Sequence, residues 1–176
     1  MADTAATALD APPPSTRLRR LDATGVLTLI ARLIVGIDFV WLGAVKILDP
    51  VPFLKAIHGY HLLPVDPPII LNATAVILPW IEVSIGVLLL CGLVRRPAAL
   101  LGIFLLVVFT AAVTNLALDY QALHPEIAFT AIELDCGCGS GVVNVASKLA
   151  GNAGLILLCA WLACSRSDRF VLRRFG

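Results

Sequence analysis

Four long apolar segments, bordered mostly by proline, glycine or charged residues, dominate the hydrophobic pattern of this chain. They run approximately over residues 24–48, 69–93, 98–118 and 142–163. A helix needs roughly 20 mostly apolar residues to cross the hydrocarbon core of a membrane, and each segment is long enough. Backbone polar groups in lipid must find their hydrogen bonds within their own segment. The pattern therefore predicts an all-α integral membrane protein, with a four-helix transmembrane bundle over residues 21–165.

The composition supports this class of protein. Of the 176 residues, 59% are hydrophobic and only 14% are charged. The net charge is +1 and no basic stripe alternates with aromatic residues, so we expect a lipid bilayer and no nucleic acid as partner. Residues 1–20 are rich in alanine and proline and have too few bulky apolar side chains to fold, which predicts a disordered N-terminal tail. Residues 166–176 form a basic C-terminal tail.

Basic residues gather on one side of the four segments. They precede the first segment, fill the second connection and follow the last segment: Arg17, Arg19, Arg20, Arg95, Arg96, Arg166, Arg169, Arg173 and Arg174. Lysine and arginine concentrate in the cytoplasmic loops of membrane proteins. We therefore expect both termini in the cytoplasm and the two longer connections on the outer face of a bacterial inner (plasma) membrane.

Charged residues inside the apolar segments need a reason, because each costs about 2.5–3.5 kcal/mol at the centre of a membrane helix. Arg32 lies early enough in the first segment to extend to the cytoplasmic head groups. Asp38 is too deep and too short for that, so it should face the bundle interior. Lys46 follows Asp38 by about 12 Å along the helix axis, which is too far for a direct ion pair. Glu82 of the second segment is therefore the better candidate as the partner of Lys46. These bundle-internal charges serve either to fix helix register or as a proton relay or quinone contact.

The stretch ELDCGCGSG, residues 133–141, holds Cys136 and Cys138 one glycine apart on the expected outer face, where disulfides persist. A bond between them needs a tightly bent backbone, which Gly137 permits, and the small ring would be strained and easily reduced. The neighbouring acids disfavour the reactive thiolate. Three uses stay open: a redox-active pair, a structural or inert pair, and a metal site. The metal site fits least, because the spacing is shorter than in structural zinc sites.

Four short motifs follow one another along the chain: KILDP at residues 46–50, YHLLP at 60–64, LPWIE at 78–82 and DCGCG at 135–139. In this order they resemble the MauE branch of the DoxX-like membrane proteins, over roughly residues 30–165. The resemblance implies a four-helix membrane protein of methylamine utilisation that supports maturation of a disulfide-rich exported protein, beside a thioredoxin-like partner. It makes Cys136 and Cys138 the redox pair, with Lys46 and Glu82 at the family's charged positions.

Residues and resemblance together favour a membrane thiol–disulfide oxidoreductase component. Cys136 and Cys138 would exchange electrons with an extracytoplasmic thioredoxin-like partner, and a membrane quinone is the candidate cofactor. The outer connections hold no second cysteine pair, so the chain needs a partner to complete a relay. The alternative is a non-catalytic accessory or structural subunit of a larger membrane electron-transfer complex, in which the internal charges serve assembly.

Overall fold

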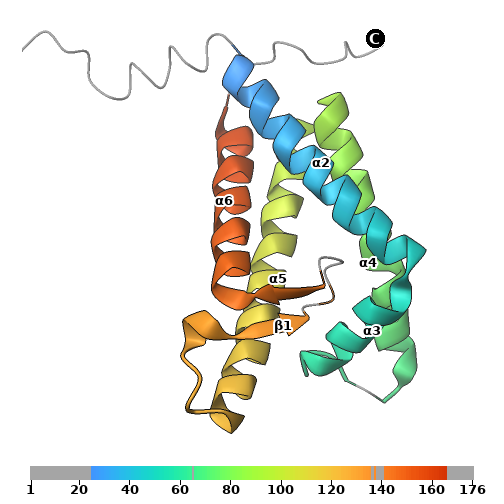
Figure 1. Cartoon of the computed structure of the whole chain (residues 1–176). Helices are drawn as coiled ribbons and strands as arrows, with labels where there is room; N and C mark the ends of the chain where they lie inside the picture. The colour runs from blue at the N-terminus through green and yellow to red at the C-terminus, as the bar shows by residue number, and fades with distance from the viewer. Residues whose placement is uncertain (1–24, 65, 136, 138–140, 166–176) are drawn as a thin grey trace, which may run out of the picture.

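The computed structural model describes residues 25–64, 66–135, 137 and 141–165, and these are mostly helical (Figure 1). Four helices are long and apolar enough to cross a membrane: α2 (Val26–Leu48), α4 (Pro68–Cys91), α5 (Arg95–Leu123) and α6 (Val145–Cys164). The four predicted spans are thus confirmed as helices. The two predicted tails and the cysteines Cys136 and Cys138 lie outside the described residues.

The helices form two closely packed pairs, α2 with α4 and α5 with α6, which contact each other through α4 with α5 and α2 with α6. The start of α2 and the end of α6 lie at the same end of the bundle (Figure 1). There Thr28 Oγ1 is 3.1 Å from Ser165 Oγ, and Arg95 Nη2 donates to the Ser165 carbonyl at 2.6 Å. Both ends of the described chain therefore share one end of the bundle, as the expected orientation requires. Which side of the membrane this end occupies stays a prediction.

Close approach of α2 to α4 depends on two glycines. A Cβ atom on Gly86 of α4 would lie 2.7 Å from the Gly36 carbonyl oxygen of α2 and 2.9 Å from the Val40 nitrogen. Both distances are shorter than van der Waals contact. Small residues let membrane helices approach in this way, because van der Waals packing is one of the main forces that hold them together in lipid.

We expect Gly86→Val to push α2 away from α4 and to destabilise the fold by about 1–3 kcal/mol, the usual cost of overpacking. The measurement is the unfolding midpoint of the purified protein in detergent. Gly154→Val is the matched control, because a Cβ atom on Gly154 of α6 meets nothing within 4 Å. An equal midpoint for the two variants would contradict this account of the α2–α4 contact.

The connection after α2 contains a helix that the hydrophobic pattern does not predict, α3 (Pro50–Gly59). Pro50 suits the first position of a helix, where the missing N–H would have no partner. Phe53 and Ile57 of α3 are buried against Leu71 and Ala75 of α4. This burial holds α3 across the end of the bundle opposite to the chain ends (Figure 1).

The connection after α5 forms an antiparallel hairpin of β1 (Glu133–Asp135) and β2 (Val142–Asn144), with Asp135 opposite Val142. The prediction that the fourth span begins at residue 142 is therefore wrong by one turn. The backbone of β2 pairs with β1 and therefore does not start the helix. Asn144 then caps α6, because its side chain accepts from the Ser147 N–H at 3.1 Å. The chain is accordingly not purely helical.

Helix α5 is longer than the predicted span of residues 98–118, because it begins at Arg95 and continues to Leu123. The extension lies beside the hairpin, where Ala117 is buried with Ile132 and Val145 and Tyr120 packs on them. Of the residues from 118 onwards, Tyr120 packs on this cluster, whereas Leu118, Asp119, Ala122 and Leu123 are exposed.

Candidate functional site

Gly137, which marks the tip of the hairpin, is seated on α3. Gly137 has a φ of +60°, which favours glycine, and its N–H donates to Asp135 Oδ1 at 2.9 Å. A Cβ atom on Gly137 would overlap the Cβ atom of Ala56 and lie 3.1 Å from the Pro52 carbonyl oxygen. Gly137 is the residue between the two cysteines in the sequence, and it contacts the bundle at Ala56, Pro52 and Phe53 of α3.

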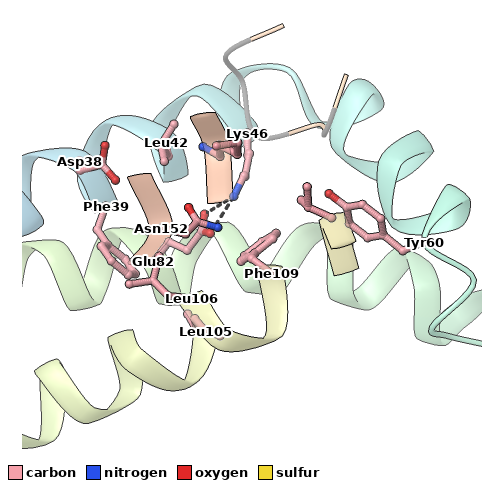
Figure 2. Close-up of a pocket in the computed structure, with 12 residues that line it drawn as sticks. Asp38, Phe39, Leu42, Lys46, Tyr60, Glu82, Leu105, Leu106, Phe109 and Asn152 are labelled. Atoms are coloured by element: carbon pink, nitrogen blue, oxygen red, sulfur yellow. Dashed lines mark hydrogen bonds and ion pairs between the residues drawn. The ribbon is translucent and has the colours of Figure 1, made fainter. Parts of the chain in front are cut away.

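A buried ion pair lies between α2 and α4. Lys46 Nζ donates to both carboxylate oxygens of Glu82, at 2.7 and 2.9 Å, and the two side chains are 3% and 7% exposed (Figure 2). The ammonium also lies 4.7 Å from the ring centroid of Phe53 and 4.4 Å from that of Phe109. The predicted pairing of Lys46 with Glu82 is thus confirmed. Paired charge and aromatic faces together compensate a buried ammonium.

The sequence positions this pair through a second close approach of α2 to α4. Gly43 lies one turn before Lys46, and Pro79 lies three residues before Glu82. A Cβ atom on Gly43 would be only 2.9 Å from the Pro79 carbonyl oxygen. Because the two helix backbones are so near at this level, the long lysine side chain can lie between them with its ammonium on the glutamate.

The ion pair forms part of the wall of a cavity inside the bundle, which we call the interior cavity (Figure 2). Its apolar wall comes from leucine, valine and phenylalanine residues of α2 and α5. Its polar wall consists of Asp38, Lys46, Tyr60, Glu82, Lys148 and Asn152. Asp38 lines the cavity from the middle of α2, as its depth in the segment predicts.

Two further hollows adjoin the interior cavity. The outer cleft lies between the corner of α2 with α3 and the hairpin tip, and Lys46, Asp135 and Gly137 line it. The side groove lies between α2 and α6. Asp38, Lys148 and Asn152 line both the side groove and the interior cavity. The three hollows are therefore neighbours that share wall residues, from the hairpin tip past the ion pair to the side of the bundle.

Sequence reasoning missed two polar residues of this site, Lys148 and Asn152. They are four residues apart in α6, and such a spacing puts both side chains on one face of the helix. Asn152 is buried, and its Nδ2 donates to Thr110 Oγ1 of α5 at 3.1 Å. A lysine and an asparagine at helical spacing inside an apolar segment were the signal that could have identified this face.

Arg32 corrects a prediction. Its side chain does not extend to the head groups, because the residue is only 2% exposed. Its Nε and Nη2 donate to the carbonyl oxygens of Leu89 and Leu90, each at 2.8 Å. These carbonyls belong to the last turn of α4, where carbonyls lack a partner four residues further along the helix, and the Leu89 carbonyl also accepts from the Gly92 N–H at 3.1 Å. Arg32 therefore satisfies the end of α4 and is remote from the hairpin tip.

Four long apolar helices around a small polar interior, with a hairpin across one end, define a multi-pass membrane protein. The family model of methylamine utilisation protein MauE matches residues 24–165. The chain therefore belongs to the MauE family, which confirms the resemblance carried by its motifs. No curated protein and no solved structure shows significant similarity to it.

Proposed function

We propose that this protein is the membrane thiol–disulfide redox component of a system that matures exported proteins. Cys136 and Cys138 are its exchanging pair, and its partner is an extracytoplasmic thioredoxin-like protein. The observation that supports this most directly is the seat of Gly137 on α3, beside the outer cleft that Lys46 lines. A residue between two cysteines is thereby held at a fixed place above a buried charge.

The exchange conserves atoms and electrons. A thiolate of the reduced partner attacks one sulfur of the Cys136–Cys138 disulfide, and the other sulfur leaves as a thiolate, so that a mixed disulfide forms. The partner's second thiolate then breaks the mixed disulfide. The partner is oxidised to its own disulfide, and the Cys136–Cys138 pair has gained two electrons and two protons. The return of the pair to the disulfide releases two electrons and two protons, which a membrane quinone would accept.

The charges around the outer cleft bear on this chemistry. Thiol exchange depends on the thiolate, which nearby cations favour and nearby carboxylates disfavour. Asp135 lines the cleft, but so does Lys46, whose ammonium has little exposure to screening water. We propose that Lys46 offsets the effect of the acidic residues next to the cysteines, while Glu82 holds its ammonium in place.

The orientation belongs to the same proposal. Arg95 and Arg96 lie at the turn between α4 and α5, at the end of the bundle opposite to the hairpin. Basic connections favour the cytoplasmic side, so the hairpin faces the outer, oxidising side of a bacterial plasma membrane. Disulfide exchange with an extracytoplasmic partner requires this orientation.

The test is the redox state of Cys136 and Cys138 in cells, fixed by acid quenching and read by alkylation with a membrane-impermeant mass tag. We expect a mixture of dithiol and disulfide that shifts when the supply of extracytoplasmic oxidant or reductant is changed. Permanently free thiols, or a bond that resists every such change, would contradict the proposal.

Replacing both cysteines, Cys136→Ser with Cys138→Ser, should abolish maturation of the exported substrate while membrane insertion stays normal. Cys164→Ser is the control, since Cys164 is an exposed free thiol at the other end of the bundle. Full activity and normal complex assembly in the double variant would instead favour the accessory subunit of a larger membrane complex.

A further inference from the structure

The side groove between α2 and α6 brings together polar side chains of α2, β2 and α6. Its polar lining residues are Asp38, Asn144, Ser147, Lys148 and Asn152, with Val143, Gly151 and Leu155 completing the wall. Polar and charged groups on membrane helices are costly and mark substrate or ion pathways more often than plain surface. Their collection in one hollow therefore calls for a ligand of matching chemistry.

Several of these groups are already engaged within the protein. Asn144 accepts from the Ser147 N–H at 3.1 Å and donates to the Thr130 carbonyl at 2.7 Å. Asn152 donates to Thr110. Among the described residues, by contrast, the half-buried Lys148 has no hydrogen bond or ion pair from its ammonium. Lys148 is thus a donor on the groove wall that a ligand could satisfy.

Gly151 leaves space in the groove. A Cβ atom added to this residue meets nothing within 4 Å, and the backbone of α6 here is exposed. Gly151 lies three residues after Lys148 and one before Asn152, so the open space is next to both polar side chains. A Cβ atom at position 151 would therefore enter this space without contacting any other part of the protein.

The lining selects the kind of ligand. One carboxylate, Asp38, and one ammonium, Lys148, line the groove. The carboxylate would repel a phosphate, and the ammonium would repel a cation. An uncharged head group that carries oxygen acceptors, and hydroxyl donors when reduced, matches both. Such a group on a lipid-soluble tail can reach the groove from the membrane.

We propose that the side groove binds the head group of a membrane quinone. The identity of the ligand rests on the proposed function, because closing the Cys136–Cys138 dithiol to a disulfide releases two electrons and two protons, and converting a quinone to its quinol takes up the same number. Asp38 and Lys148 are the groups on the groove wall that can hold or move a proton. Asp38, Lys148 and Asn152 also line the interior cavity, and the ion pair forms part of the wall of that cavity.

The experiment measures quinone bound to the purified full-length protein, extracted and quantified by liquid chromatography. It uses the Cys136→Ser, Cys138→Ser background, so binding is read without any thiol chemistry. In this background Gly151→Phe should lower the quinone per protein by at least about tenfold. Gly154→Phe is the matched control and should retain it, because Gly154 has the same open surroundings but does not line the groove.

A second variant, Lys148→Met, should also lower the bound quinone, and it keeps the test valid if Gly151→Phe fails to fold. Equal quinone in the two phenylalanine variants, or phospholipid as the only extracted ligand, would overturn the proposal. The two proposals fail separately. If Gly151→Phe lowers the bound quinone but the cysteines never change redox state, the quinone site is supported and the thiol function is refuted. If the cysteines change redox state but Gly151→Phe leaves the bound quinone unchanged, the thiol function is supported and the quinone site is refuted.

Discussion

Glu82→Leu is expected to destabilise this protein by about 3–5 kcal/mol, the usual cost of removing one partner from a buried ion pair. The variant leaves the Lys46 ammonium, 3% exposed, between α2 and α4 without its counter-charge. The rings of Phe53 and Phe109 remain beside it as in the unchanged protein, so their contacts with the ammonium do not replace the lost counter-charge. The measurement is equilibrium unfolding in mixed micelles of mild detergent and dodecyl sulfate.

The double variant Lys46→Met with Glu82→Leu is the control. It removes both charges and keeps apolar volume at the site, so most of the stability should return. A double variant as unstable as Glu82→Leu alone would show that packing, and not the unpaired ammonium, causes the loss.

The same double variant separates an architectural pair from one that acts on the cysteines. If Lys46 favours the thiolate near the hairpin tip, a stably folded double variant should exchange disulfides more slowly than the unchanged protein. A structural pair would leave the exchange rate unaltered once stability is restored. The rate of mixed-disulfide formation with a reduced thioredoxin-like protein, followed as a function of pH, measures this directly.

The four spans could be predicted from the sequence because the thickness of the bilayer fixes the length of an apolar helix. The pairing of Lys46 with Glu82 could be predicted for a related reason, since both lie at a similar depth in adjacent helices and neither can reach water. These features follow from local composition and position along the chain. They do not depend on the details of side-chain packing.

The remaining features depend on tertiary contacts. Residues 142–144 are as apolar as the span that follows, and only pairing with β1 makes them a strand. Helix α3 is stabilised by burial of Phe53 and Ile57 against α4. The helical spacing of these residues is visible in the sequence, but the surface that buries them is not. The contact of Arg32 with the end of α4 was missed because the sequence does not show where those carbonyls lie.

The site was predictable in part for the same reason. Charges deep in a span stand out, so Asp38, Lys46 and Glu82 could be identified from cost alone. Lys148 and Asn152 lie in the first two turns of α6, nearer to the end of the span, so their cost in the membrane is less evident than that of a charge at its middle. Their importance comes from facing the same groove as Asp38, which only the packing of α2 on α6 determines.

Gly137→Ala should detach the hairpin tip from α3 and slow redox cycling of the cysteine pair, without unfolding the four-helix bundle. The substitution has two physical consequences. The backbone at position 137 has a φ of +60°, which costs a residue with a side chain about 1–2 kcal/mol. The new Cβ atom also overlaps the Cβ atom of Ala56. We expect faster hydrogen exchange at the β1 and β2 amides. We also expect the ratio of dithiol to disulfide at the cysteine pair to respond less to the supply of oxidant.

Gly141→Ala isolates the first consequence, because Gly141 has a φ of +68° and its added Cβ atom meets nothing within 4 Å. Combining Gly137→Ala with Ala56→Gly isolates the second, because it removes the overlap and keeps the backbone cost. If the contact with α3 positions the pair, Gly141→Ala should have the smaller effect and Ala56→Gly should restore much of the cycling, relative to Ala56→Gly alone. Equal defects in all three would mean that backbone freedom at the tip, and not its seat on α3, governs the exchange.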